Sequence, residues 1–150
     1  MDFMISEELK SVQHLAQQIL GDFTEVDKLK AIEQQEERFD SALWGALAEA
    51  GLLGLDIPES NGGTELGFYG LTMLCEEVGR TVAQVPVIPV LVSAAGTLRR
   101  FASSGQKDQW LNGIASGTTL VTAALGEYNN DDPAAPACTA RKMEGGYSIS

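Results

Sequence analysis

The sequence contains few of the residues from which metal centres and disulfide frameworks are built. Its 150 residues include two cysteines, Cys75 and Cys138, and a single histidine, His14. Two cysteines outside a Cys-x-x-Cys spacing do not make a disulfide framework, and one histidine cannot supply a metal cluster. We therefore expect no metal site, and we interpret Cys75, on an apolar helical face, as a small core residue.

Basic residues are also scarce, with 10 Lys and Arg against 21 Asp and Glu, a net charge of −11. Binding to nucleic acid or to an anionic membrane surface requires a cationic face, which this balance argues against. No apolar stretch approaches the ~20 residues that span a bilayer. The acidic N-terminus lacks the basic start and apolar run of a secretory signal. These absences predict a cytoplasmic protein that binds neither nucleic acid nor membrane.

The segment from residue 39 to residue 80 carries the clearest helical pattern. Asp40 is a good N-cap, and Phe39 and Trp44 stand at the spacing of a hydrophobic staple around it. Apolar residues then recur at three and four positions, which predicts a helix that Gly51 ends in the left-handed conformation.

A loop and a second helix follow. Pro58 excludes further helix, and Gly62 and Gly63 are expected to turn with positive φ. The next helix should end at 79–80, and one apolar stripe marks its buried face: Leu71, Leu74, Cys75 and Val78.

Further helices flank this segment. Ser6 is expected to cap a first helix that ends near Phe23, with His14 outside its apolar stripe of Leu9, Val12, Leu15, Ala16 and Ile19. The charged residues 25–38 predict a surface connection or irregular helix. Residues 81–89, with two prolines, should be extended, with Pro89 in the first turn of the next helix.

That next helix is strongly apolar, and we expect it at the centre of a bundle. Its buried face should comprise Val90, Leu91, Ala94, Ala95, Leu98 and Phe101. We interpret Arg99 and Arg100 as partners of the helix dipole in preference to a phosphate site. A last helix, from 106 to 115 and capped by Ser104-Gly105, should bury Trp110, Leu111 and Ile114.

From Thr118 the pattern predicts β-structure. Residues 118–125 favour a strand, 129–136 a loop, and 138–143 with 147–150 a hairpin that turns at 144–146. So few strands leave edges uncovered, so we expect the polypeptide to continue beyond Ser150. The predicted fold is mainly α, with a helical domain over 1–117 and the beginning of a β domain over 118–150.

Three pieces of sequence carry a family resemblance. They are the run LWGALAEAGLLGL at 43–55, the loop Pro58-Glu59-x-x-Gly62-Gly63, and CEEVGR at 75–80. In this order and spacing they resemble the N-terminal helical bundle of the acyl-CoA dehydrogenases, a family that includes actinobacterial enzymes of the steroid or fatty acyl-CoA type. The resemblance implies a β-barrel-like middle domain after the helices, an FAD cofactor, an acyl-CoA substrate and a dimeric or tetrameric assembly, either homo- or hetero-oligomeric.

In that family the first strand of the middle domain ends in Thr-Glu-Pro, followed by Gly-Ser-Asp, at the flavin and the substrate. The resemblance therefore assigns cofactor binding to Ala124, Leu125 and Gly126, and substrate binding to Asp132. Glu127 matches the motif. Gly126 stands in place of the threonine and Tyr128 in place of the proline, and the Gly-Ser-Asp position falls near Asp131-Asp132, with no serine. Loss of one hydroxyl contact weakens a flavin site by about 0.5–1.5 kcal/mol.

The reaction that the resemblance implies is α,β-dehydrogenation of an acyl-CoA thioester. The family's catalytic base is a glutamate of a C-terminal helical domain that this sequence does not contain, so we assign no catalytic residue here. We interpret Glu59, Glu76 and Glu77 as loop or helix-surface charges. Two other functions stay open: a non-catalytic partner subunit of a heteromeric acyl-CoA dehydrogenase, as in some actinobacterial steroid enzymes, and a helical binding module.

Overall fold

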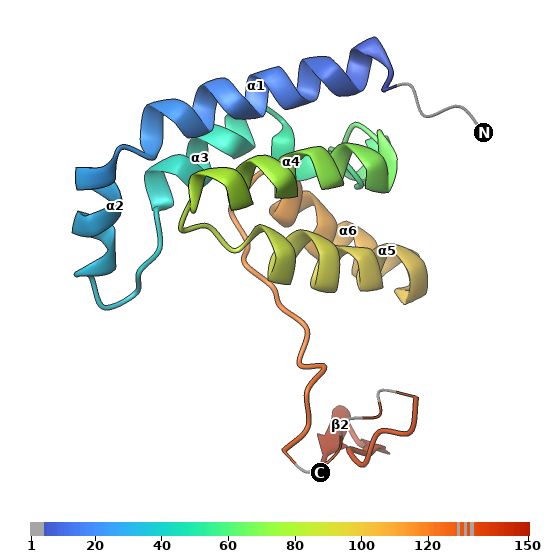
Figure 1. Ribbon diagram of the computed structural model, residues 1–150. Helices are drawn as coiled ribbons and strands as arrows, with labels where there is room; N and C mark the ends of the chain where they lie inside the picture. Colours follow the sequence, from blue (N-terminus) through green and yellow to red (C-terminus); the bar gives the residue numbers. More distant parts are fainter. Residues whose placement is uncertain (1–4, 129, 131, 133) are drawn as a thin grey trace.

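The computed structural model describes residues 5–128, 130, 132 and 134–150, and shows a helical body, a long connection and a β-hairpin (Figure 1). Two short 3-10 helices, η1 (Leu52–Gly54) and η2 (Glu59–Asn61), lie in the body, and the π-helix η3 (Ile88–Ala95) runs directly into α5 (Gly96–Phe101). The elements of the body are α1 (Glu7–Phe23), α2 (Val26–Glu33), α3 (Ser41–Glu49), η1 (Leu52–Gly54), η2 (Glu59–Asn61), α4 (Gly67–Thr81), η3 (Ile88–Ala95), α5 (Gly96–Phe101) and α6 (Ser104–Ala115). The mainly α fold expected from the sequence is confirmed.

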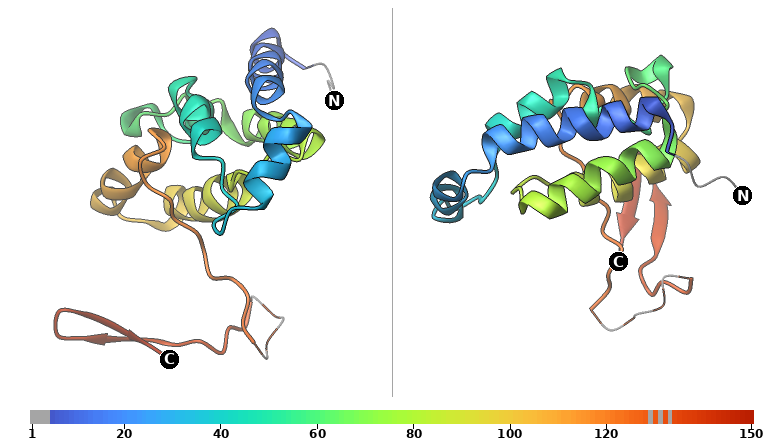
Figure 2. Two further views of the ribbon diagram at one scale, coloured as in Figure 1. Left: turned by 90° about the vertical axis from the view of Figure 1, so that its left-hand side faces the viewer. Right: turned by 45° about the horizontal axis from the view of Figure 1, so that its top comes forward.

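Helix α1 lies along α4, as both figures of the whole chain show (Figures 1 and 2). Ser6 caps α1 as predicted, its hydroxyl accepting a hydrogen bond from the backbone N–H of Leu9 at 3.2 Å. The predicted stripe is partly wrong, because Leu15 is 39% exposed whereas Leu20 is fully buried. The residues that face the core follow a spacing of four, namely Val12, Ala16 and Leu20.

Helix α3 begins and ends as the sequence predicts. The carboxylate of Asp40 accepts a hydrogen bond from the backbone N–H of Leu43 at 2.9 Å. The rings of Phe39 and Trp44 meet edge to face with centroids 6.2 Å apart, and Gly51 has a φ of 72°. Trp44 is buried and its indole N–H donates to the backbone oxygen of Gly117 at 3.1 Å, which ties α3 to the end of α6.

The two glycines of the 58–63 loop are needed for different reasons. Gly62 has a φ of 81°, as predicted. Gly63 has no positive φ, so that part of the prediction is wrong. Its backbone instead passes so close to another segment that a Cβ there would lie 2.0 Å from the carbonyl oxygen of Ile57. A side chain is excluded at Gly63 by tertiary packing, not by a turn.

The apolar helix expected after the prolines is present as η3 and α5. Pro89 occupies its first turn, as predicted, but before it only residues 83–86 lack regular secondary structure, and the backbone N–H groups of Val85 and Val87 form turns there by bonding to residues 83 and 85. Val90, Leu91, Ala94 and Ala95 are buried, whereas Phe101 is 80% exposed, contrary to the prediction. Phe101 is the last residue of α5 and borders a surface hollow, so no other described element covers its ring.

Helix α6 begins earlier than predicted. Its N-cap is Ser103, which forms a capping box with Gln106, so Ser104 is already helical. Leu111 and Ile114 are fully buried as expected, but Trp110 is 37% exposed. Trp110 therefore lies at the border of the buried face and not within it.

The C-terminal part contains one hairpin and no other strand among the residues that the structure describes. Strands β1 (Ala140–Met143) and β2 (Gly146–Ile149) pair antiparallel, with Arg141 opposite Ser148. Residues 118–125 were predicted to form a strand, and this prediction is wrong. The chain from 118 to 126 is extended, but no described segment pairs with it, so it forms no strand. Figure 1 and the left view of Figure 2 show the hairpin standing away from the helices.

Candidate functional site

The expected cofactor-binding residues lie on the connection between α6 and the hairpin. Ala124, Leu125 and Gly126 are all exposed and belong to an extended stretch of backbone. Among the described residues, no backbone hydrogen bond joins 120–126 to another part of the chain. The peptide N–H and C=O groups of Leu125 and Gly126 are therefore open to another partner.

The surroundings of Gly126 fit a flat, carbonyl-bearing group such as the ring system of a flavin. A Cβ at this position would meet no atom within 4 Å, so the backbone can be approached closely from the side. Free amide donors and the absence of a side chain suit a carbonyl oxygen of a planar ligand. The backbone of Leu125 and Gly126 is therefore accessible to a ligand such as FAD, without the hydroxyl that a threonine would add.

Glu127 organises the loop that follows. Its carboxylate accepts hydrogen bonds from the backbone N–H groups of Cys138 and Ala137, both at 2.8 Å, and from the side-chain amide of Asn130 at 3.0 Å. These donors stabilise the charged form and lower the pKa of Glu127. The sequence identified Glu127 only as a match to the family motif. Its hydrogen bonds could not be predicted, because the partners lie up to eleven residues further along the chain.

Asp132, the residue assigned to the substrate position, is exposed and is engaged within its own loop. Its carboxylate accepts a hydrogen bond from the N–H of Ala134 at 2.9 Å, and its own N–H donates to the side chain of Asn130 at 3.1 Å. The neighbouring Asp131 lies outside the described residues. The Asp132 carboxylate thus forms an Asx turn in this structure.

A hollow of about 650 Å³ borders the beginning of the same connection. Leu120 of the connection lines it, together with Arg38 and Phe39 before α3 and residues 83–86 before η3. Arg38 has a φ of 47°, which is uncommon outside glycine, and the side-chain oxygen of Gln84 is buried without a hydrogen-bond partner among the described residues. Sequence reasoning missed this hollow, because its walls come from three separate parts of the chain.

Glu77 is buried, which corrects its interpretation as a helix-surface charge. It is 1% exposed and accepts hydrogen bonds from Gln13 at 3.1 Å and Gln17 at 2.8 Å, both on α1, and from Arg80 at 2.6 Å. Burial alone would raise the pKa of Glu77, but these hydrogen bonds and the charge of Arg80 outweigh it, and the pKa is lowered. A carboxylate held ionised in this way joins α1 to α4 and is unsuited to be a general base.

The part of the chain that the structure describes contains neither a metal-binding cluster nor a membrane-spanning helix. No group of three or more His, Cys, Asp or Glu residues is arranged there to hold a metal ion. None of its helices combines the length and the apolar character needed to cross a bilayer.

Residues 6–118 match the family model described as "Acyl-CoA dehydrogenase, N-terminal domain". The chain is 31% identical over 139 residues to acyl-CoA dehydrogenase FadE27 of Mycobacterium tuberculosis, covering 93% of this chain and 37% of that protein. It is 30% identical over 144 residues to the mitochondrial short-chain specific acyl-CoA dehydrogenase of Mus musculus, covering 93% and 35%. The chain therefore spans little more than a third of these relatives.

Solved structures show the same relationship. A steroid ACAD, the Tcur3481-Tcur3483 G363A variant, is 44% identical with a TM-score of 0.89 over 96% of this chain and 39% of that one. An acyl-CoA dehydrogenase complexed with FAD from Bacillus anthracis is 26% identical with a TM-score of 0.82, over 97% of this chain and 25% of that one. Because the family model covers most of its length, the chain belongs to the acyl-CoA dehydrogenase family.

Proposed function

We propose that the complete protein is an FAD-dependent acyl-CoA dehydrogenase that carries out α,β-dehydrogenation of an acyl-CoA thioester. This chain would supply the N-terminal helical domain over 1–117 and the beginning of the middle domain over 118–150. The family match over residues 6–118 supports this division. The observation that carries the proposal is the extended, unpaired backbone at Leu125 and Gly126, which offers peptide groups where the family contacts its flavin.

In this proposal FAD, when bound, supplies the two-electron acceptor chemistry, and the residues of this chain supply binding and orientation. The peptide N–H groups of Leu125 and Gly126 would hold the flavin by donating to one of its carbonyl oxygens, with Ala124 beside them on the same stretch. Glu127 fixes the loop that follows, through its bonds to Ala137 and Cys138. Asp132 lies at the position that faces the substrate in the family. No residue of this chain is proposed to remove a proton from the substrate.

The acyl group belongs to the same proposal. The structural neighbour with 44% identity is named a steroid ACAD, which favours a steroid-derived acyl-CoA, with a fatty acyl-CoA as the other candidate. The two classes can be separated by comparing kcat/KM for a steroid side-chain CoA ester with that for a straight-chain acyl-CoA.

A second function, a partner subunit that completes the site of another chain, is favoured by one specific observation. Gly126 lacks the hydroxyl expected at the flavin, and the neighbour with 44% identity carries a two-component name, Tcur3481-Tcur3483. In this case the protein would be one half of a hetero-oligomer and would retain flavin only together with its partner.

The experiment is to purify the complete gene product and to record its visible absorption spectrum before and after anaerobic addition of an acyl-CoA. The proposed function predicts stoichiometric flavin that bleaches on addition of substrate. The partner-subunit function predicts a folded, colourless protein that gains flavin after co-expression with a second subunit. A folded protein without flavin in both cases would contradict both functions.

A matched pair of variants tests the role of Gly126. Gly126→Thr adds the missing hydroxyl and should tighten flavin retention about threefold to tenfold, as expected for one hydrogen bond. Gly21→Thr adds the same hydroxyl on an exposed face of α1, where a Cβ meets no atom within 4 Å, and should leave flavin retention unchanged. Equal retention in both variants would remove Gly126 from the flavin site.

A further inference from the structure

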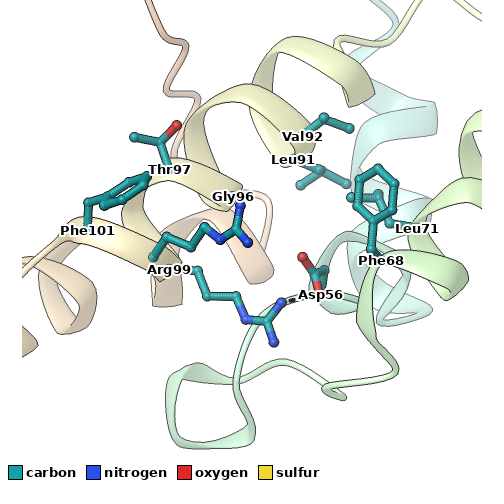
Figure 3. A pocket seen from close by; sticks show the side chains of 10 residues that line it. Asp56, Phe68, Leu71, Leu91, Val92, Gly96, Thr97, Arg99 and Phe101 are labelled. Carbon is teal, nitrogen blue, oxygen red and sulfur yellow. Dashed lines mark hydrogen bonds and ion pairs between the residues drawn. The ribbon is translucent and has the colours of Figure 1, made fainter. Parts of the chain in front are cut away.

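A second hollow, of about 460 Å³, opens where the beginning of α4 meets η3 and α5 (Figure 3). Its floor is aliphatic, because Leu71 and Leu91 line it and are almost fully buried. Two aromatic side chains also line the hollow, Phe68 from α4 and Phe101 from α5, and they lie at opposite ends of it in Figure 3, with Leu71 and Leu91 at the Phe68 end. These rings are 58% and 80% exposed, so a large apolar surface here is in contact with water.

The charges around this hollow do not cancel. Asp56 accepts a hydrogen bond from the guanidinium of Arg99, and both groups line the hollow. Arg100, which also lines it, is exposed and has no carboxylate partner among the described residues. The rim therefore carries one positive charge in excess, on a chain whose net charge is −11.

The helix wall of the hollow is open at one position. Gly96 lines it, and a Cβ there would meet only the carbonyl oxygen of Leu91, at 3.9 Å. A Cβ at this position would therefore enter the hollow without displacing the backbone. The space above Gly96 is available to a ligand.

We propose that this hollow binds an amphipathic organic carboxylate, with its aliphatic body between Phe68 and Phe101 and its carboxylate at Arg100. Small-molecule sites are typically hollows of about 300–1,000 Å³ with an apolar lining and a few charged or polar groups that orient the ligand. The floor of Leu71 and Leu91 buries the aliphatic part, which gains free energy from the loss of apolar surface to water. Arg100 selects an anion over a neutral molecule, because Arg99 is already paired with Asp56.

The experiment is a calorimetric titration of decanoate into the complete, folded protein at pH 7. Binding of one decanoate is expected, with 1-decanol binding more weakly. Arg100→Gln should weaken decanoate binding about threefold to tenfold, the range for a charge pair near the surface. Arg141→Gln removes the same charge from the exposed strand β1 and should leave the affinity unchanged.

Gly96→Leu distinguishes this hollow from any other site on the protein. The leucine side chain would fill the space above the helix, so decanoate binding should be lost while the circular dichroism spectrum and the turnover of acyl-CoA are kept. Absence of decanoate binding to the folded protein would overturn the proposal, as would unchanged binding in Gly96→Leu or equal effects of Arg100→Gln and Arg141→Gln. If decanoate does not bind and Phe101→Ser alters the oligomeric state, the surface is a contact between polypeptides and the proposal is wrong.

Discussion

Replacement of Gly63 by alanine tests the most tightly constrained point of the helical body. The new Cβ would lie 2.0 Å from the carbonyl oxygen of Ile57 and 2.6 Å from that of Gly54. Real Cβ atoms essentially never lie closer than 3.0 Å to a non-bonded heavy atom of another segment. The two backbone segments must therefore separate by at least 1.0 Å, the difference between 3.0 and 2.0 Å. Two hydrogen bonds hold this crossing, from Thr64 N–H to Gly54 O at 3.0 Å and from Glu65 N–H to Ile57 O at 3.1 Å.

The expected loss of stability follows from that geometry. Loss of two backbone hydrogen bonds costs about 1 kcal/mol each, and residual overpacking adds about 1–3 kcal/mol. Gly63→Ala should therefore lower the free energy of unfolding by about 3–5 kcal/mol, measured by urea titration of the purified protein with far-UV circular dichroism.

The matched control is Gly45→Ala, at an exposed position in the interior of α3 where a Cβ meets no atom within 4 Å. It should stabilise the protein by about 0.5–1 kcal/mol, because alanine is the better helix former. A Gly63→Ala protein within 0.5 kcal/mol of the wild type would refute the reasoning, since the loop would then relax without cost.

Four further predictions concern the buried Trp44 and the carboxylates of Glu77 and Glu127. Trp44→Phe should cost about 1 kcal/mol in urea unfolding, because it removes the indole hydrogen bond to a backbone carbonyl. Glu77→Leu should cost about 1–3 kcal/mol, and replacing its two half-buried glutamine partners on α1 with leucine as well should recover most of the loss, because neither amide is then left without a partner. The folded pKa of Glu77 lies below its ordinary 4.5, so its contribution is present above pH 4.5 and is lost as the pH falls through the folded pKa. Glu77→Gln should flatten this acid loss, and an unchanged acid profile would contradict the assignment. Glu127→Ala should speed amide hydrogen exchange at Ala137 and Cys138 without changing global unfolding, and unchanged exchange there would show that its hydrogen bonds do not hold the loop.

Local signals predicted the helices well. Caps at Ser6 and Asp40, the staple of Phe39 with Trp44 and the stop at Gly51 depend on neighbours within a few residues, so the sequence pattern contains all that they need. The exposure of Phe101 could not be predicted in this way, because its helical spacing fits a buried face. Whether such a position is covered depends on which element packs over it.

The candidate functional site, too, was predicted from the sequence only in part. The sequence predicted that Ala124, Leu125 and Gly126 follow the helical domain, which it placed over residues 1–117. The predicted strand there did not form, because a strand exists only when another segment pairs with its backbone, and no described segment does so. The hollow beside Arg100 was missed because its walls come from α4, η3, α5 and the loop at Asp56.

The sequence by itself determined the family, the order of the helices and the position, after residue 117, at which the helices end and the extended chain begins. These depend on short-range spacing, caps and turn residues, which act within about one or two helical turns. Tertiary structure alone decided that Glu77 is a buried link between α1 and α4, that Gly63 must lack a side chain, and that Phe68, Phe101 and Arg100 surround one hollow. The physical reason is that each of these features depends on atoms from segments distant in the chain, whose approach no local pattern records.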